Sequence, residues 1–222
     1  MKKVLIIGDS SATPREELPF DKTYYARLKR NKDLDIENSA VANNTSYKIL
    51  NKLEAFMLYG FSPDVVVLNY GIVDVYPRPY SNVIHKILTN LKLISAVDWV
   101  LKKTRLYYKL GDLFNFKEVS EIKFKRYSEQ LVRNLVEKGV DQIVVCGIIK
   151  PDKVLLKSKN IIKEVMVYNQ ILQDLSTQNE KVDYIDMFDV ADESFTIWDG
   201  YHYSVKASEH LAKKIEDLIT DD

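Results

Sequence analysis

The feature that most constrains the fold is a regular alternation between short apolar runs and longer segments with helical periodicity. The apolar runs are rich in β-branched residues and lie at 3–8, 33–41, 63–71, 141–149 and 181–187. The helical segments lie at 20–31, 46–60, 118–139, 158–179 and 204–219. Strands that alternate with helices pair in parallel through right-handed crossovers. The sequence therefore predicts an α/β fold: a five-stranded parallel sheet covered by helices on both faces, in three layers.

The length of the chain fits one domain. At 222 residues and 46% hydrophobic composition, it lies slightly above the usual range of about 100–200 residues per domain. One interval, 72–117, is longer than a crossover requires, and we expect a helical insertion at about 80–117 within a single domain that covers 1–222. This insertion is either a lid or wall of a binding site, or an extra packing or dimer surface.

The charge balance argues against some partners. Lysine plus arginine equals aspartate plus glutamate, at 32 each, which gives no support to nucleic acid or an anionic membrane as the main partner. Apolar residues 4–7 are too few for the core of a signal peptide, which has about 7–15 residues. No segment approaches the about 20 apolar residues of a membrane span. We expect a cytoplasmic protein with no membrane partner, and its oligomeric state is open.

Metal and cofactor motifs are missing from the sequence. The single cysteine, Cys146, lies in the apolar run QIVVCGII, which predicts a buried thiol rather than a metal ligand or a disulfide. No H-E-x-x-H pair or aspartate-rich calcium loop is present. The segment VLIIGDSSAT lacks the second and third glycines of a dinucleotide-binding loop. We expect neither a metal nor a cofactor.

The first apolar run ends abruptly in Gly8-Asp9-Ser10. In open α/β sheets, ligands bind just beyond the carboxyl ends of the strands, so Ser10 is placed where a nucleophile could act. We expect Asp9 to accept a hydrogen bond from the backbone of the following turn and to fix the position of Ser10.

A serine nucleophile needs a base, and the chain has only three histidines. Two of them, His85 and His210, lie on predicted helices where nothing marks them as catalytic. The third, His202, follows Asp199 by three residues, so the carboxylate can accept Nδ1–H and leave Nε2 free to take a proton. Ser10, Asp199 and His202 are thus the candidate catalytic residues.

These motifs resemble the first and last conserved blocks of the SGNH or GDSL hydrolases. GDS at 8–10 is similar to the first block and DGYH at 199–202 to the last, and the resemblance spans essentially the whole chain. It implies a flavodoxin-like α/β/α sandwich with five parallel strands. It also implies that Ser10 is the nucleophile, that its backbone N–H helps to bind the oxyanion, and that Asp199 and His202 complete the triad.

The two middle blocks depart from the family pattern. In the second block, Asn43 replaces a glycine whose N–H lines the oxyanion hole, and asparagine tolerates the left-handed conformation that this requires. The third block, G-x-N-D, aligns with Gly71-Ile72-Val73-Asp74, so Val73 replaces the asparagine side chain that donates to the oxyanion. The loss of one such donor typically costs about 10²–10³ in turnover.

Three nearby polar residues are candidates for the missing donor: Asn44, Asn69 and Arg78. The segment NYGIVDVYPRPY at 69–80 resembles a subgroup of SGNH-type proteins found among polysaccharide biosynthesis genes. Arg78 either binds an anionic group of the substrate or pairs with Asp74 or a helix C-terminus to fix its loop. The sequence leaves both interpretations open.

The residues and the resemblance together predict a serine-dependent ester hydrolase that forms an acyl-Ser10 intermediate. The backbone of Ser10 and Asn43 and a third donor would bind the oxyanion. The resemblance implies an O-acetylated carbohydrate as substrate. One alternative is acyl transfer to a sugar hydroxyl by the same residues. Another is a non-catalytic carbohydrate-binding or scaffold protein, which Val73 favours and the candidate triad opposes.

Overall fold

The computed structural model describes residues 1–58, 62–104 and 106–220. Five parallel strands form the central sheet in the order β2-β1-β3-β6-β7. The strands are β1 (Lys2–Gly8), β2 (Leu34–Asn38), β3 (Val65–Asn69), β6 (Gln142–Cys146) and β7 (Val182–Ile185). This confirms the predicted α/β fold class, and each strand lies within one of the predicted apolar runs, except that β1 begins one residue earlier, at Lys2.

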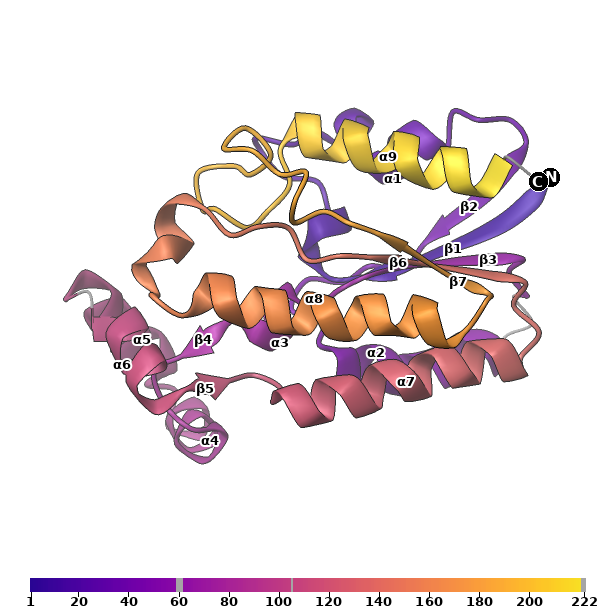
Figure 1. Cartoon of the computed structure of the whole chain (residues 1–222). Coiled ribbons are helices and arrows are strands. Elements are labelled where there is room, and N and C mark those ends of the chain that lie inside the picture. The colour runs from indigo at the N-terminus through magenta and orange to yellow at the C-terminus, as the bar shows by residue number, and fades with distance from the viewer. Residues whose placement is uncertain (59–61, 105, 221–222) are drawn as a thin grey trace.

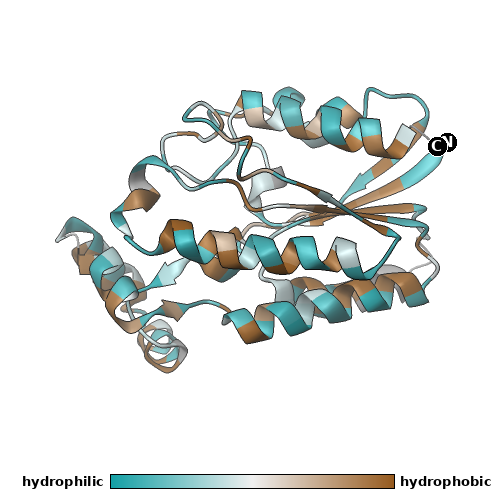
Figure 2. Ribbon diagram, viewed as in Figure 1, coloured by the Kyte–Doolittle hydropathy of each residue, from teal (hydrophilic) through white to brown (hydrophobic). Residues whose placement is uncertain are grey.

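The central strands are apolar along their whole length because helices cover both of their faces. All five residues of β3 are buried, and Val67 of β3 lies opposite Ile6 of β1 and Val144 of β6. Figure 2 shows the hydrophobic colour concentrated in these strands and on the helix sides that face them. The sheet therefore separates two hydrophobic clusters, one on each face.

Two sets of helices cover the sheet (Figure 1). Helices α1 (Tyr24–Leu28) and α9 (Val205–Thr220) pack on one face, and α2 (Ser46–Leu58), α7 (Glu121–Glu137) and α8 (Ile161–Gln178) on the other. The segment 20–31, predicted as one helix, is divided into the short 3-10 helix η2 (Phe20–Lys22) and α1. The extended Thr23 separates them, and its side chain caps α1 by accepting a hydrogen bond from the N–H of Ala26. Residues 59–60, predicted as the end of the 46–60 helix, lie outside the described residues.

The long interval after β3 begins with α3 (Ile72–Val75) and β4 (Pro77–Arg78). The segment at about 80–117, interpreted as a helical insertion, contains α4 (Asn82–Asn90), α5 (Ile94–Lys103), α6 (Leu106–Phe114) and β5 (Phe116–Lys117). Strands β4 and β5 pair antiparallel, so the insertion leaves and rejoins the domain at one place. Figure 1 shows α4, α5 and α6 beyond the end of the sheet where β3 and β6 terminate.

Within residues 1–58, 62–104 and 106–220, no helix is both long enough and apolar enough to cross a bilayer.

Candidate active site

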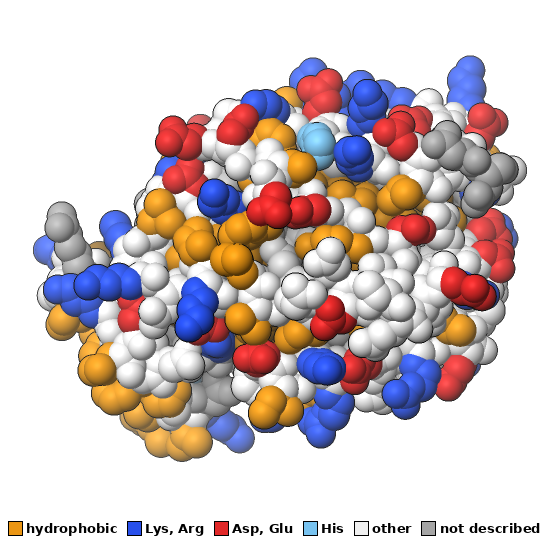
Figure 3. Space-filling view, in the orientation of Figure 1, with side chains coloured by type: hydrophobic (Ala, Val, Ile, Leu, Met, Phe, Trp, Pro, Cys, Tyr) orange, Lys and Arg blue, Asp and Glu red, His pale blue; other side chains and the backbone are white. Residues whose placement is uncertain are grey.

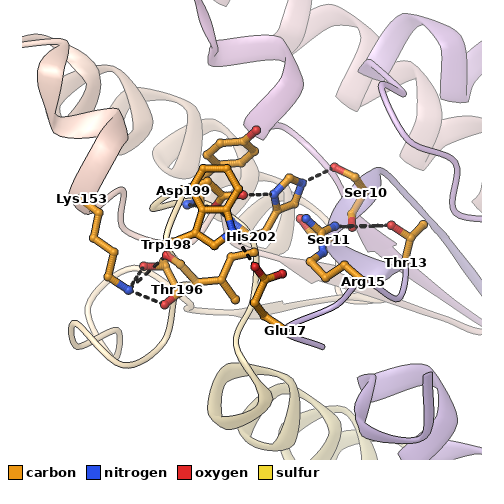
Figure 4. Close-up of polar contacts among 12 residues, drawn as sticks. Ser10, Ser11, Thr13, Arg15, Glu17, Lys153, Thr196, Trp198, Asp199 and His202 are labelled. Atoms are coloured by element: carbon orange, nitrogen blue, oxygen red, sulfur yellow. Dashed lines mark hydrogen bonds and ion pairs between the residues drawn. The ribbon is translucent and has the colours of Figure 1, made fainter. Parts of the chain in front are cut away.

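The three candidate catalytic side chains lie in a row (Figure 4). The Oγ atom of Ser10 is 2.8 Å from Nε2 of His202, and Nδ1 of His202 is 2.6 Å from Oδ2 of Asp199. Ser10 follows β1, whereas Asp199 and His202 lie in the segment before α9, so the fold brings together residues 192 positions apart. A hydroxyl, an imidazole and a carboxylate connected in this order can activate the hydroxyl as a nucleophile.

Hydrogen bonds within the turn from Asp199 to His202 fix its conformation. Oδ1 of Asp199 accepts hydrogen bonds from the N–H groups of Tyr201 and His202, each at 3.1 Å. Gly200 has a φ of 82°, and a Cβ atom there would lie only 1.6 Å from the carbonyl oxygen of Asp152. Only glycine fits this turn without rearrangement.

The loop that follows β6 also forms hydrogen bonds with this turn. The N–H of Asp152 donates to the carbonyl of Gly200 at 2.8 Å. The ammonium group of Lys153, at the start of the 3-10 helix η3 (Lys153–Lys157), donates to the carbonyls of Thr196 and Ile197 at 2.6 and 3.1 Å. Figure 4 shows Lys153 reaching toward Thr196 beside Asp199.

Hydrogen bonds also position Ser10, the first residue of the 3-10 helix η1 (Ser10–Ala12). As expected, Asp9 caps this turn, with its Oδ1 accepting from the N–H of Ser11 at 2.9 Å. The carbonyl oxygen of Ser10 accepts from the guanidinium of Arg15 at 2.6 Å and from the hydroxyl of Thr13 at 2.8 Å. The backbone on both sides of the nucleophile is therefore constrained.

Two carboxylates near Ser10 have shifted pKa values in opposite directions. Burial raises the pKa of Asp9 to about 6, although the hydrogen bonds from Ser11 partly offset the shift. Burial also acts to raise the pKa of Asp199, but the hydrogen bonds from the ring and N–H of His202 outweigh it, and the pKa is lowered. Asp199 is thus ionised at neutral pH and can stabilise a protonated imidazole.

The Ser10 side chain opens into a cavity of about 440 Å³, a size typical of small-molecule sites. Loops at the carboxyl ends of the strands form one side, and the insertion forms the other. The cavity is lined by Ser10, Thr13, Arg15, Ala42, Asn43, Ile72, Val73, Tyr76, Arg78, Asp98, Lys102, Tyr107, Tyr201 and His202.

Two backbone donors are available at this cavity. Asn43 has a φ of 60°, the left-handed conformation that asparagine tolerates better than other residues with a side chain. In the described part of the chain, the N–H groups of Ser10 and Asn43 have no hydrogen-bond partner. Val73 forms part of the wall and supplies no donor from its side chain.

Two of the expected candidates for the third donor do not line the cavity. The Asn44 amide is buried and donates to the carbonyl of Gly8 at 3.1 Å. The Asn69 amide is also buried, donating to the hydroxyl of Tyr24 at 3.2 Å and accepting from that of Tyr203 at 3.1 Å. Both amides therefore connect structural elements rather than point at Ser10.

The other third-block residues also take structural positions. Gly71 precedes α3 with a φ of 119°, and a Cβ atom there would lie 2.7 Å from the Ile148 side chain. Asp74 is buried against Ser46, and burial raises its pKa to about 7 despite the hydrogen bonds from Ser46. Arg78 lines the cavity, and its Nε donates to Glu118 at 3.0 Å, so of the alternatives left open by the sequence, the pairing with Asp74 is replaced by one with Glu118.

Several residues of the cavity were not anticipated from the sequence. Arg15 is one, although it follows the candidate nucleophile by only five residues. Asp98 and Lys102 are others, and their i,i+4 spacing places them on one side of α5. A charged residue on a predicted helix usually points into solvent. Only the position of the insertion beside the cavity therefore shows that Asp98 and Lys102 line it.

Residues 1–58, 62–104 and 106–220 contain no cluster of three or more His, Cys, Asp or Glu side chains that could bind a metal ion.

Comparisons with known proteins identify the fold. No family model matches the sequence, and no curated protein matches it. The structure is similar to a lipase/acylhydrolase from Enterococcus faecalis (16% identity, TM-score 0.69, covering 99% of this chain and 95% of that one). It is similar to the acetyl xylan esterase AlAXEase (17% identity, TM-score 0.66, 98% and 99% coverage). It is also similar to a member of the lipolytic protein G-D-S-L family from Veillonella parvula DSM 2008 (10% identity, TM-score 0.63, 99% of both chains). At these identities, the similarity establishes a common fold.

Proposed function

We propose that this protein is a serine-dependent ester hydrolase of the SGNH or GDSL type. The observation that carries the proposal is the Ser10–His202–Asp199 contact series at the edge of a cavity. The fold shared with a lipase/acylhydrolase and an acetyl xylan esterase supports it. A structural role alone does not require a hydroxyl, an imidazole and a carboxylate aligned beside unpartnered backbone N–H groups.

In the first half of the reaction, Nε2 of His202 takes the proton of the Ser10 hydroxyl while Oγ attacks the ester carbonyl carbon. The resulting oxyanion accepts hydrogen bonds from the N–H groups of Ser10 and Asn43. Asp199 stabilises the imidazolium. The C–O bond to the alcohol then breaks, His202 returns its proton to the leaving alkoxide, and the acyl group stays on Ser10.

In the second half, water replaces the alcohol. His202 takes a proton from water, whose oxygen attacks the acyl-Ser10 carbonyl. The bond to Oγ breaks, the proton returns to Ser10, and a carboxylic acid leaves. With Val73 in place of a side-chain donor, we expect turnover slower by about 10²–10³ than with a three-donor oxyanion hole.

For the substrate, we propose an O-acetylated carbohydrate. Tyr76, Tyr107 and Tyr201 line the cavity, and aromatic rings stack on the apolar faces of sugars. The third block also resembles that of SGNH-type proteins of polysaccharide biosynthesis. Acyl transfer to a sugar hydroxyl uses the same residues and differs only in the acceptor that attacks acyl-Ser10.

Hydrolysis of a chromogenic acetate ester by the wild type, Ser10→Ala and His202→Ala tests the reaction. We expect both variants to lose the activity. Acetylated xylan and an octanoate ester then test the substrate class, with faster release of acetate expected. A sugar acceptor that raises ester consumption while lowering acetate release would show transfer instead.

Equal background rates for all three proteins, on both the chromogenic ester and acetylated xylan, would contradict an esterase. Binding of the xylan under those conditions would instead support the non-catalytic carbohydrate-binding alternative.

A further inference from the structure

Exposed apolar side chains gather on the insertion. Ten of the nineteen large apolar side chains that are exposed in the described residues lie within 83–114. We call these ten the insertion surface: Val83, Ile84, Ile87, Leu91, Leu93, Trp99, Val100, Leu106, Leu113 and Phe114. Figure 3 shows apolar side chains concentrated at the end of the molecule occupied by α4.

Helices α4 and α5 of the insertion leave much of their apolar surface exposed, whereas α6 buries Tyr107 and Tyr108 in the core. Val83 and Ile87 of α4 and Leu91 at its C-cap recur every four residues along one side, yet they are 69%, 52% and 61% exposed. Helix α5 buries none of its residues completely, and Trp99 at its centre is 62% exposed. A monomer rarely leaves so many apolar side chains together in water without a partner.

The insertion is more basic than the chain as a whole. Residues 82–114 contain six basic residues and two acidic ones, a net charge of +4, whereas the whole chain has zero. Both acids face the protein: Asp98 lines the cavity, and Asp112 accepts from the N–H of Lys159 at 2.8 Å. The exposed Lys86, Lys92 and Lys109 form no ion pair in the described residues.

We propose that the insertion surface docks on an anionic lipid bilayer. Short helices that combine exposed aliphatic and tryptophan side chains with lysines bind in the plane of a membrane interface. At nine and ten residues, α4 and α5 are too short to span a bilayer, so they lie on it. The net charge of the whole chain is zero, so it gives no indication of this local basic region.

A second copy of the chain fits the same surface less well. In a two-fold dimer through this surface, the two insertions face each other, so two regions of the same net positive charge are brought together. An anionic lipid surface instead attracts them.

Docking would also determine where the cavity lies. Asp98 and Lys102 of α5 and Tyr107 of α6 line the cavity, so the helices that bind the bilayer also form one of its walls. Docking at the insertion surface therefore positions the cavity at the membrane, where it can receive a substrate attached to lipid. The docking itself does not depend on the proposed esterase activity.

Co-sedimentation of the full chain with phosphatidylcholine vesicles, with and without phosphatidylglycerol, tests the proposal. We expect at least tenfold stronger binding to the anionic vesicles and a decrease with added salt. Ile87→Glu and Lys86→Glu should each weaken binding severalfold. The matched controls, Ile122→Glu on the 82% exposed Ile122 of α7 and Lys213→Glu on α9, should bind like the wild type.

A second measurement needs no change in the insertion. The chain has two tryptophans, and Trp198→Phe leaves Trp99 as the only one. We expect the Trp99 fluorescence to shift to the blue when anionic vesicles are added. An unchanged spectrum, equal binding to both kinds of vesicle, or a dimer that Ile87→Glu dissociates without any vesicle binding would each overturn the proposal.

Discussion

The carboxylate of Asp74 accepts hydrogen bonds from both the backbone N–H and the hydroxyl of Ser46, at 2.9 and 2.6 Å. Ser46 is the first residue of α2, and Asp74 lies in α3. Both side chains are fully buried. The contact joins the segment that carries Asn43 to the one that carries Val73, so it fixes the spacing of two walls of the cavity.

Replacement of Asp74 by alanine should destabilise the protein. The substitution leaves the N–H and hydroxyl of Ser46 buried without their acceptor, which costs about 1–3 kcal/mol. Urea denaturation measures the free energy of unfolding. Asp35→Ala, at an exposed position on β2, is the matched control and should change it little. Equal stability of the two variants would show that the Asp74–Ser46 contact contributes nothing net.

Asp74 should also make stability depend on pH. Burial raises its pKa from the ordinary value of 3.8 to about 7, so the folded state binds the proton more tightly than the unfolded state. Its contribution is complete below pH 3.8 and is lost as the pH rises through about 7. The raised pKa of Asp9, about 6, likewise lowers the stability as the pH rises. The lowered pKa of His210 has the opposite effect, because its neutral form is favoured in the folded state and stability rises with pH.

The difference between wild type and Asp74→Asn isolates this effect. Between about pH 4 and pH 7, the wild type should lose stability relative to the variant, because asparagine does not titrate. Urea denaturation at several pH values measures this change, with Asp35→Asn as the control. A constant difference across the range would contradict the raised pKa.

The sequence was sufficient for the fold because its signals are local. Apolar runs such as Val65–Asn69 are buried on both faces, and each is followed by a segment with helical periodicity. The break at Thr23 was missed because a hydrogen bond from Ala26 makes that threonine a cap inside a segment with continuous helical spacing. Local patterns also indicate helices between β3 and α7, but not where those helices pack.

For the candidate site, sequence motifs identified the residues whose chemistry is distinctive. These residues, Ser10, Asp199 and His202, lie in hydrogen-bond contact in the structure. Nothing in the sequence indicates where the amides of Asn44 and Asn69 point. The Asn44 amide forms a hydrogen bond with Gly8, and the Asn69 amide with Tyr24 and Tyr203, and all of these partners are distant in sequence. Arg15 was missed because its partner is a backbone carbonyl, a contact that no residue pattern encodes.

Exchange of Asp199 for asparagine should abolish most of the esterase activity. An amide can donate to Nδ1 of His202, which would then place the proton on Nε2 and prevent it from accepting the Ser10 proton. The same exchange in serine protease triads lowers kcat by about 10⁴. We expect a comparable loss in steady-state assays, and no further loss when Asp199→Asn is added to Ser10→Ala. An additive loss in the double variant would mean that Asp199 acts independently of Ser10.

Arg15 should act as a positioning residue for Ser10. Its guanidinium donates to the Ser10 carbonyl, and a charge-assisted hydrogen bond of this kind corresponds to about ten- to a hundredfold in rate. Arg15→Gln should therefore lower kcat by about that factor with little change in KM, and Arg15→Lys should restore part of it. Arg133→Gln, at an exposed site on α7, is the control. A rise in KM alone would instead indicate that Arg15 binds the substrate.

Substitution of Val73 by asparagine should raise turnover. Val73 lines the cavity at the place where the SGNH pattern has a side-chain donor, and the two unpartnered N–H groups of Ser10 and Asn43 supply the others. A third donor to the oxyanion raises kcat by a factor of up to about 10²–10³. We therefore expect kcat to increase, by less than this factor where the new amide is imperfectly placed. Val73→Ala is the matched control, because it enlarges the cavity without adding a donor. If Val73→Asn is no faster than Val73→Ala, the oxyanion is bound elsewhere, and Arg78 is the next residue to replace.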